Sequence, residues 1–260
     1  MNNPLPKLAI SLESSPSENG SVIFLHGSGA NSQMWSKHFE SIGGNWHCIA
    51  PDFPGHGKSR DIEWTTLEDV ADSVALVILE KCGGKASLVG LSLGGSVIFK
   101  ILQKYPQLIC SAIIDGASAK PIAGARMICF GVKLIAPFIK YNPVIKIMAG
   151  ALGVDSRGFQ SFSDSMKSVT PRAFGRAMTQ ANMADMDINS FNINIPILFM
   201  SGESEASIMH STHIELASKI PGSKFYIHPD AGHAWMIKDT RTHINLVQSW
   251  LTENHKSQQS

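Results

Sequence analysis

The feature that most constrains the fold is one stretch, Lys85-Ala-Ser-Leu-Val-Gly-Leu-Ser-Leu-Gly-Gly95. Its apolar run Ala86–Val89 is typical of a buried parallel strand, and the apolar spacing over Ser96–Tyr105 is typical of a helix. A glycine stands two residues to either side of Ser92, which leaves room for two backbones to approach closely in a sharp turn. The stretch therefore predicts a serine hydroxyl at a helix N-terminus, where N–H groups and the helix dipole favour developing negative charge.

This stretch resembles the G-x-S-x-G nucleophile elbow of the α/β-hydrolase family, in which Ser92 would be the nucleophile. A second segment, Asp52-Phe-Pro-Gly-His-Gly-Lys-Ser59, is similar to the family's D-x-P-G-x-G-x-S turn at every fixed position. The resemblance covers essentially the whole chain. It implies acyl transfer through serine, a chemistry that needs no metal and no organic cofactor.

Strand and helix patterns alternate along most of the chain. Seven apolar runs predict strands: Lys7–Glu13, Ser21–Leu25, Trp46–Ala50, Ala86–Val89, Cys110–Ile114, Ile195–Met200 and Lys224–Ile227. Such alternation with right-handed crossovers predicts an α/β fold, with a mostly parallel sheet covered by helices on both faces. The family resemblance implies an eight-stranded sheet.

The alternation stops between Ser118 and about Asn192, where helical segments are broken by prolines and glycines. The resemblance implies a helical cap inserted here over the active site. We therefore expect a hydrolase core of residues 1–117 and 193–260 and a cap (lid) of residues 118–192. Apolar cap residues are expected either to line an acyl pocket or to pack the cap on the core: Leu134, Phe138, Ile139, Ile145, Ile147, Met148 and Leu152.

A serine hydroxyl is a weak nucleophile at neutral pH and needs a base that titrates near pH 7, which points to histidine. Of the ten histidines, His233 follows the last predicted strand in a Gly-His loop ahead of the final helix. The family resemblance implies this position for the base, with the order serine, acid, histidine along the chain. His233 is therefore the predicted catalytic base.

The triad acid is less sharply determined. The family usually has aspartate three residues after a glycine at the end of the strand before the base strand, and Glu205 holds that position here. Asp115 is the alternative acid, because it ends the strand after the elbow helix, where some family members keep theirs. Glu203 is a third candidate. Glu205 is the preferred assignment, although its extra methylene requires the loop to sit differently.

The oxyanion hole is implied by the resemblance and by a glycine-rich loop. His26-Gly-Ser-Gly-Ala-Asn31 leaves an apolar run, so main-chain N–H groups can face a ligand. By resemblance, the backbone N–H groups of Ser28 and Leu93 would be the two donors. His26 is expected to brace this loop rather than to act as a base.

The overall composition limits which other kinds of partner are expected. The hydrophobic fraction is 43% and the charged fraction 17%, as in globular proteins. The net charge of +1 gives no reason to expect nucleic acid or an anionic membrane as a partner. The four cysteines show no metal spacing, and no apolar run approaches the roughly 18 residues of a membrane span. No secretory signal is visible at the N-terminus, so a cytoplasmic location is expected. Composition does not indicate an oligomeric state.

The leading hypothesis is a carboxylesterase-like serine hydrolase that acts on small or medium apolar esters. Lactonase, thioesterase, aminopeptidase and carbon–carbon bond hydrolase activities use the same triad and stay open. A ligand-binding protein with slow or absent turnover is a second class, favoured only by glutamate at position 205. A lyase such as a hydroxynitrile lyase is a third. Serine at the elbow argues against haloalkane dehalogenases and epoxide hydrolases, which resemble this family but carry aspartate there.

Overall fold

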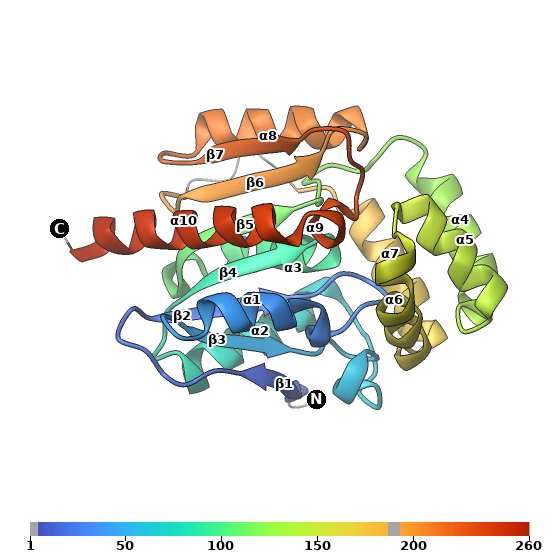
Figure 1. Ribbon diagram of the computed structural model, residues 1–260, viewed down its shortest axis with the longest axis horizontal. Coiled ribbons are helices and arrows are strands. Elements are labelled where there is room, and N and C mark those ends of the chain that lie inside the picture. The colour runs from blue at the N-terminus through green and yellow to red at the C-terminus, as the bar shows by residue number, and fades with distance from the viewer. Residues whose placement is uncertain (1–4, 187–192, 260) are drawn as a thin grey trace.

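The computed structural model describes residues 5–186 and 193–259, which build a seven-stranded sheet between two layers of helices (Figure 1). The strands lie in the order β1-β3-β2-β4-β5-β6-β7. Their bounds are β1 Ile10–Glu13, β2 Ser21–Leu25, β3 His47–Pro51, β4 Ala86–Leu91, β5 Ile109–Asp115, β6 Ile197–Gly202 and β7 Lys224–His228. β1 pairs antiparallel with β3, and every other neighbouring pair is parallel. The predicted α/β class with a mostly parallel sheet is confirmed.

The predicted number of strands is wrong. Eight strands were expected from the family resemblance, whereas the sheet of the described residues has seven. The physical reason is that each apolar run with a strand pattern forms one strand. The described residues contain seven such runs, and the sheet ends at the antiparallel edge strand β1.

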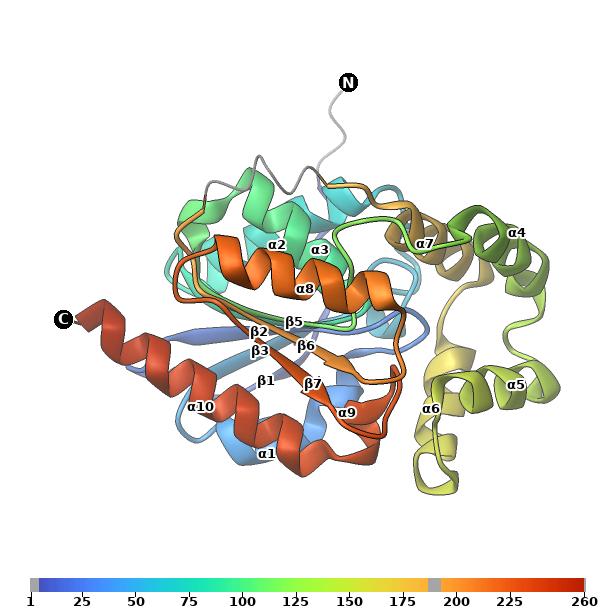
Figure 2. The ribbon, with the colours of Figure 1, turned by 90° about the horizontal axis from the view of Figure 1, so that it is seen from above.

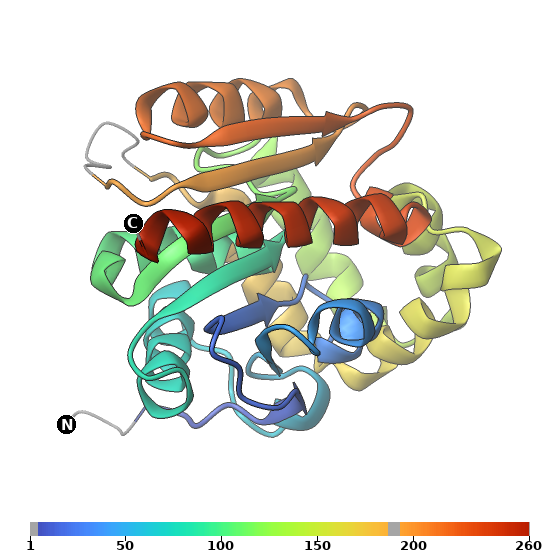
Figure 3. The same cartoon turned by 60° about the vertical axis from the view of Figure 1, so that its left-hand side comes forward.

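Alternate side chains of the central strands pack into two apolar layers, one on each face of the sheet. In β2, Ile23 and Leu25 pack in one layer and Val22 and Phe24 in the other, as the two-residue period of a strand requires. Helices α2 (Leu67–Lys81), α3 (Leu93–Lys104) and α8 (Ser207–Lys219) cover one face (Figure 2). Helices α1 (Ser36–Ile42), α9 (Trp235–Lys238) and α10 (Thr240–Gln259) cover the other, where α10 (red in Figure 3) runs along the sheet.

Four helices between β5 and β6 form a cap at the carboxyl ends of the parallel strands (Figure 1). They are α4 (Ala125–Ile135), α5 (Asn142–Leu152), α6 (Ser156–Ser168) and α7 (Pro171–Met183). The cap has a small apolar cluster of its own that includes Ile139, Met166 and Phe174. The exact domain boundaries stay a prediction, and residues 187–192 of the expected cap lie outside the described residues.

Helix α7 connects the cap to the core. Its Ala173 and Ala177 join the apolar layer built by α2 and α3. The Thr170 N–H, one residue before α7, donates to the Gly55 carbonyl at 2.8 Å, and Trp64 Nε1 donates to Gln180 Oε1 at 3.1 Å. The turn after β3 therefore positions the base of the cap over the sheet.

Candidate active site

Ser92 is the single residue between β4, which ends at Leu91, and α3, which begins at Leu93. Its φ of 53° and ψ of −110° are strained for a residue with a side chain, a conformation that costs about 1–3 kcal/mol and recurs at functional sites. The flanking glycines allow the turn: a Cβ on Gly90 would lie 2.6 Å from the carbonyl carbon of Gly94. The elbow geometry expected from the sequence is present.

A histidine–carboxylate pair stands on the two loops that follow β6 and β7. His233 Nδ1 lies 2.8 Å from Glu205 Oε2, and the Glu205 side chain is 5% exposed. The second carboxylate oxygen, Oε1, accepts the Gly202 N–H at 3.0 Å. A carboxylate held at both oxygens fixes the orientation of the imidazole and the tautomer with the proton on Nδ1, which leaves Nε2 free to accept a proton.

The pair shifts the protonation of both partners. Burial disfavours the charge on each group, but the bond between them outweighs it. The pKa of Glu205 is lowered, because the bond from His233 offsets its burial. The pKa of His233 is raised, because the adjacent Glu205 carboxylate outweighs the desolvation of the ring. The arrangement would stabilise an imidazolium at His233.

The other two candidate acids have different partners. Asp115 Oδ1 accepts from Trp235 Nε1 at 2.9 Å, and Oδ2 lies 3.5 Å from His243 Nε2 in the buried layer beneath α10. Glu203 accepts the Asp230 N–H at 2.9 Å. The hydrogen-bond geometry thus favours Glu205 as the partner of His233.

Gly116, which follows β5, borders the pair. With φ at +60°, a Cβ at this position would lie 2.8 Å from His233 Cε1 and 3.6 Å from Glu205 Oε1. Sequence analysis missed this residue. Its position directly after Asp115 at a strand end is the signal that could have found it, since ligand-facing residues gather at the carboxyl ends of parallel strands.

The glycine-rich loop after β2 lies beside the elbow. A Cβ on Gly27 would be 3.7 Å from the Ser92 Cβ, so the adjoining Ser28 backbone is close to the serine. His26 is fully buried: it accepts the Phe53 N–H at Nε2 (3.0 Å), and its Nδ1 donates to the Gly27 carbonyl (2.8 Å). Burial lowers the pKa of His26, so the ring stays neutral and braces the loop.

A cavity of about 490 Å³ joins the serine to the pair. Ser92, Leu93, Gly116, Glu205 and His233 all line it, whereas Ser28 is not among its lining residues. Most of the remaining wall is apolar or small, with Ile122 and Leu152 from the cap segment and Met209 from α8. Lining residues that the sequence analysis did not single out include Lys120, Ile122, Met178, Asn182 and Met209.

The expectation for the seven apolar cap residues needs correction. Leu152 lines the cavity, while Ile139 and Ile145 are buried within the cap and Met148 packs beside them. Leu134, Phe138 and Ile147 are 59%, 53% and 71% exposed. These three side chains neither line the cavity nor pack on the core, because they stand on the side of the cap opposite to its buried face.

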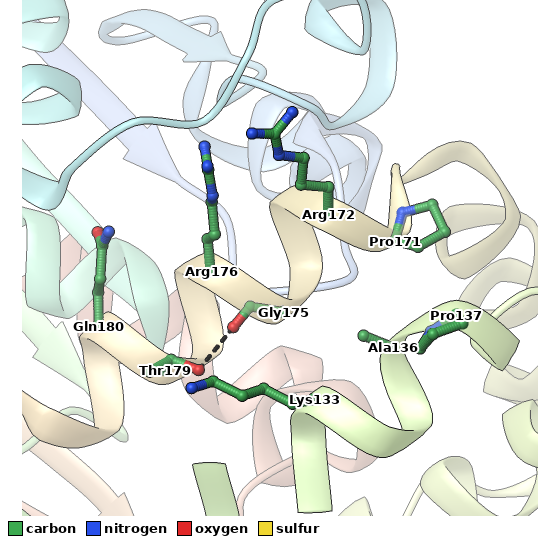
Figure 4. A pocket seen from close by; sticks show the side chains of 9 residues that line it. All are labelled: Lys133, Ala136, Pro137, Pro171, Arg172, Gly175, Arg176, Thr179 and Gln180. Carbon is green, nitrogen blue, oxygen red and sulfur yellow. Dashed lines mark hydrogen bonds between the residues drawn. The ribbon is translucent and has the colours of Figure 1, made fainter. Parts of the chain in front are cut away.

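A second, more open groove of about 630 Å³ lies on the outside of the cap between α4 and α7 (Figure 4). Its floor includes Ala136, Pro137 and Gly175, and Lys133 extends across it toward Thr179. It contains none of the residues of the serine site. The candidate site is therefore the cavity at Ser92.

Metal binding and membrane spanning are the next two properties of the described residues. Across residues 5–186 and 193–259, no group of three or more His, Cys, Asp or Glu side chains has an arrangement that could hold a metal ion. Among the helices that the structure describes, none combines the length and the apolar character that crossing a membrane requires.

Comparison with known proteins gives the family. Residues 22–242 match the model of the "Alpha/beta hydrolase family", and the chain belongs to this family. It is 25% identical to a pimeloyl-[acyl-carrier protein] methyl ester esterase of Neisseria meningitidis, over 92% of this chain and 95% of that protein.

The fold comparison agrees. A thermophilic esterase from Thermogutta terrifontis superposes with a TM-score of 0.80 at 22% identity, covering 95% of this chain and 94% of that one. An enol-lactonase from Burkholderia xenovorans LB400 superposes with a TM-score of 0.80 at 18% identity, covering 94% and 96%. At these identities the structural likeness establishes the fold. The chain is an α/β hydrolase.

Proposed function

We propose that this chain is a serine esterase that hydrolyses carboxylic esters of small or medium apolar acids through an acyl-enzyme at Ser92. The observation that carries the proposal is the shared cavity: a strained serine, a histidine and the carboxylate bonded to that histidine line one apolar space. Nucleophile, base and orienting acid are the parts that acyl transfer needs.

In the proposed mechanism, Ser92 Oγ attacks the ester carbonyl carbon while His233 Nε2 takes the hydroxyl proton. The oxygen that becomes negative accepts from the backbone N–H groups of Ser28 and Leu93, each contributing about 3 kcal/mol of transition-state stabilisation. Protonated His233 then gives its proton to the leaving alcohol oxygen as the carbon–oxygen bond breaks. Glu205 stabilises the imidazolium in both steps.

Deacylation repeats the same steps with water. His233 removes a proton from the water that attacks the acyl carbon, and then returns that proton to Ser92 Oγ, which releases the carboxylic acid. All transferred protons are carried by His233.

The substrate class is inferred from the cavity. Its volume of about 490 Å³ is within the range of sites for small organic ligands, and its cap-side wall is mostly apolar or small, with Lys120 and Asn182 as polar members. The names of the relatives support an ester rather than an amide, since one is a methyl ester esterase and another an esterase. The enol-lactonase supports a cyclic ester as the second candidate.

The test is hydrolysis of p-nitrophenyl acetate, butyrate and octanoate by folded wild type and three variants. Ser92→Ala should lower kcat by about 10⁶-fold and Glu205→Ala by about 10⁴-fold, as removal of a nucleophile or an orienting acid does. Asp115→Ala, the matched control for losing a buried carboxylate, should retain far more activity. An inactive wild type, or an active Ser92→Ala, refutes the esterase and leaves the ligand-binding alternative.

A further inference from the structure

The cap segment between Asp115 and Asp155 has a one-sided charge. It contains five basic residues and no acidic residue: Lys120, Arg126, Lys133, Lys140 and Lys146. The remainder of the chain has 17 basic and 21 acidic residues, so a net +1 protein consists of a segment with charge +5 and a remainder with charge −4. The near-neutral total conceals a strongly basic surface.

The same segment exposes large apolar side chains. Six of them are more than half exposed: Met127 (79%), Phe130 (65%), Leu134 (59%), Phe138 (53%), Tyr141 (63%) and Ile147 (71%). Single exposed apolar residues are normal on protein surfaces, but a contiguous group marks an interaction site. We call the outward surface of α4 and α5, with these residues and the basic residues between them, the cap face.

Helical geometry puts basic and apolar side chains of α4 side by side. Met127, Phe130 and Leu134 follow the three- and four-residue spacing of one outward stripe. Arg126 and Lys133, seven residues apart, form a basic row beside it, on the side of α4 where Lys133 borders the groove with α7. Cys129, on the opposite side of the helix, is buried.

Helix α5 repeats this arrangement. Lys146 and Ile147 point outward, whereas Ile145 and Ala149 are buried in the cap. Helices α4 and α5 lie at the outer edge of the molecule, away from the sheet (Figures 1 and 2). Within the described residues, neither Lys133 nor Lys146 has an acidic ion-pair partner.

The segment that builds the cap face also contributes to the wall of the catalytic cavity. Ile122, just before α4, lines the cavity, and so do Gly150 and Leu152 at the end of α5. A ligand on the cap face would therefore contact a segment that also forms part of the cavity wall.

We propose that the cap face docks on an anionic lipid surface as a peripheral, non-spanning contact. Apolar side chains such as Phe130 and Ile147 would enter the boundary between headgroups and acyl chains, and the lysines would stay at headgroup level with their alkyl stems buried. A remainder with charge −4 favours the orientation with the cap toward the anionic surface and the core away from it.

Lipid fits this face better than a protein partner does. Three of the four cations on the cap face are lysines, since Lys120 precedes α4, lines the catalytic cavity and pairs with Glu215 at 3.2 Å. Lysine is depleted at protein–protein interfaces, whereas lysine next to aromatic and aliphatic side chains is typical of helices in a membrane interface. A second copy of the chain fits worse still, since a symmetric contact through this face would bring Arg126, Lys133, Lys140 and Lys146 of both copies together.

The consequence for the substrate rests on the proposed function. If Ser92 is the nucleophile, docking presents the cavity to esters dissolved in the lipid layer, so apolar esters would reach the site without crossing water. Membrane docking itself depends on the cap face alone and is tested without catalysis.

The experiment is co-sedimentation with two kinds of vesicle, neutral phosphatidylcholine and phosphatidylcholine with about 30% phosphatidylglycerol. Wild type should partition onto the anionic vesicles, and less so as salt is raised from 0.05 to 0.5 M. Lys133→Gln with Lys146→Gln should weaken that partition about 25-fold, at about fivefold for each lysine near the surface. Phe130→Ser with Ile147→Ser should also weaken binding to the anionic vesicles.

Controls separate docking from folding and catalysis. Lys37→Gln with Leu79→Ser changes an exposed lysine on α1 and a 54% exposed leucine on α2, outside the cap, and should bind vesicles like wild type. Ser92→Ala should also bind like wild type, even if no ester is hydrolysed. Only variants whose thermal unfolding midpoint equals that of wild type are compared.

Four results would overturn the proposal. Docking is refuted if wild-type protein stays in the supernatant with both kinds of vesicle. It is also refuted if the cap-face variants sediment with anionic vesicles as strongly as the Lys37/Leu79 control. If wild type does not bind vesicles but forms a complex with an acidic carrier protein, and the lysine variant does not form that complex, the cap face binds a protein instead. A dimer in solution that the Phe130/Ile147 variant dissociates would reassign it to a second copy.

Discussion

Gly116→Ala is the change that tests the geometry of the site most directly. A methyl group at this position would lie 2.8 Å from His233 Cε1 and 2.9 Å from His233 Nδ1. Carbon atoms in contact prefer about 3.5–4.0 Å, so the imidazole would have to move by about 0.7 Å. That movement also strains the 2.8 Å bond from Nδ1 to Glu205.

The expected loss follows from this displacement. A catalytic group misplaced by about 1 Å costs on the order of 100-fold in rate, so we expect kcat/KM to fall about 10- to 100-fold. A second effect is independent of the site. Gly116 has φ at +60°, a left-handed conformation that costs alanine about 1–2 kcal/mol of stability.

The matched control is Gly83→Ala. Gly83 has nearly the same φ, +64°, but a Cβ there would meet no atom within 4 Å. Both variants should lose similar stability in urea unfolding, and only Gly116→Ala should lose activity on p-nitrophenyl butyrate. Full activity of Gly116→Ala, or equal loss in both variants, would refute the placement of His233.

Three further predictions follow from named contacts. Glu205→Gln removes the charge that raises the pKa of His233, so the acid limb of the kcat/KM profile should move to lower pH while the plateau falls; an unmoved limb argues against the pair. Burial lowers the pKa of His56 from 6.5 to about 3, so stability should decline as pH falls from 6.5 toward 3, and His56→Gln should flatten the decline of the thermal midpoint between pH 6 and 4. Gly94→Ala drives a Cβ into the Leu25 carbonyl and should abolish folding; soluble protein with wild-type stability would contradict the tight elbow.

Much of this protein is determined locally and is therefore readable from its sequence. The elbow at Ser92 is specified by glycines on either side and by the change from a strand pattern to a helix pattern, all within one short stretch. The alternation of apolar runs and amphipathic segments determines the α/β class in the same way, because side-chain periodicity reflects local backbone geometry. The seven apolar runs predicted the seven strands that the structure has. The number eight came from the family resemblance, and it was wrong.

The tertiary structure decided what depends on distant segments meeting. Glu205, Asp115 and Glu203 all follow strands, and only the folded chain brings Glu205 to His233 and Asp115 to Trp235. The cap residues give the clearest case. Leu134, Phe138 and Ile147 have the composition of a pocket wall, but their direction depends on how α4 and α5 sit against the rest of the cap, and the fold turns them outward. The sequence shows that a side chain is apolar. Whether that side chain is buried, and against which surface, is decided by how the helices pack.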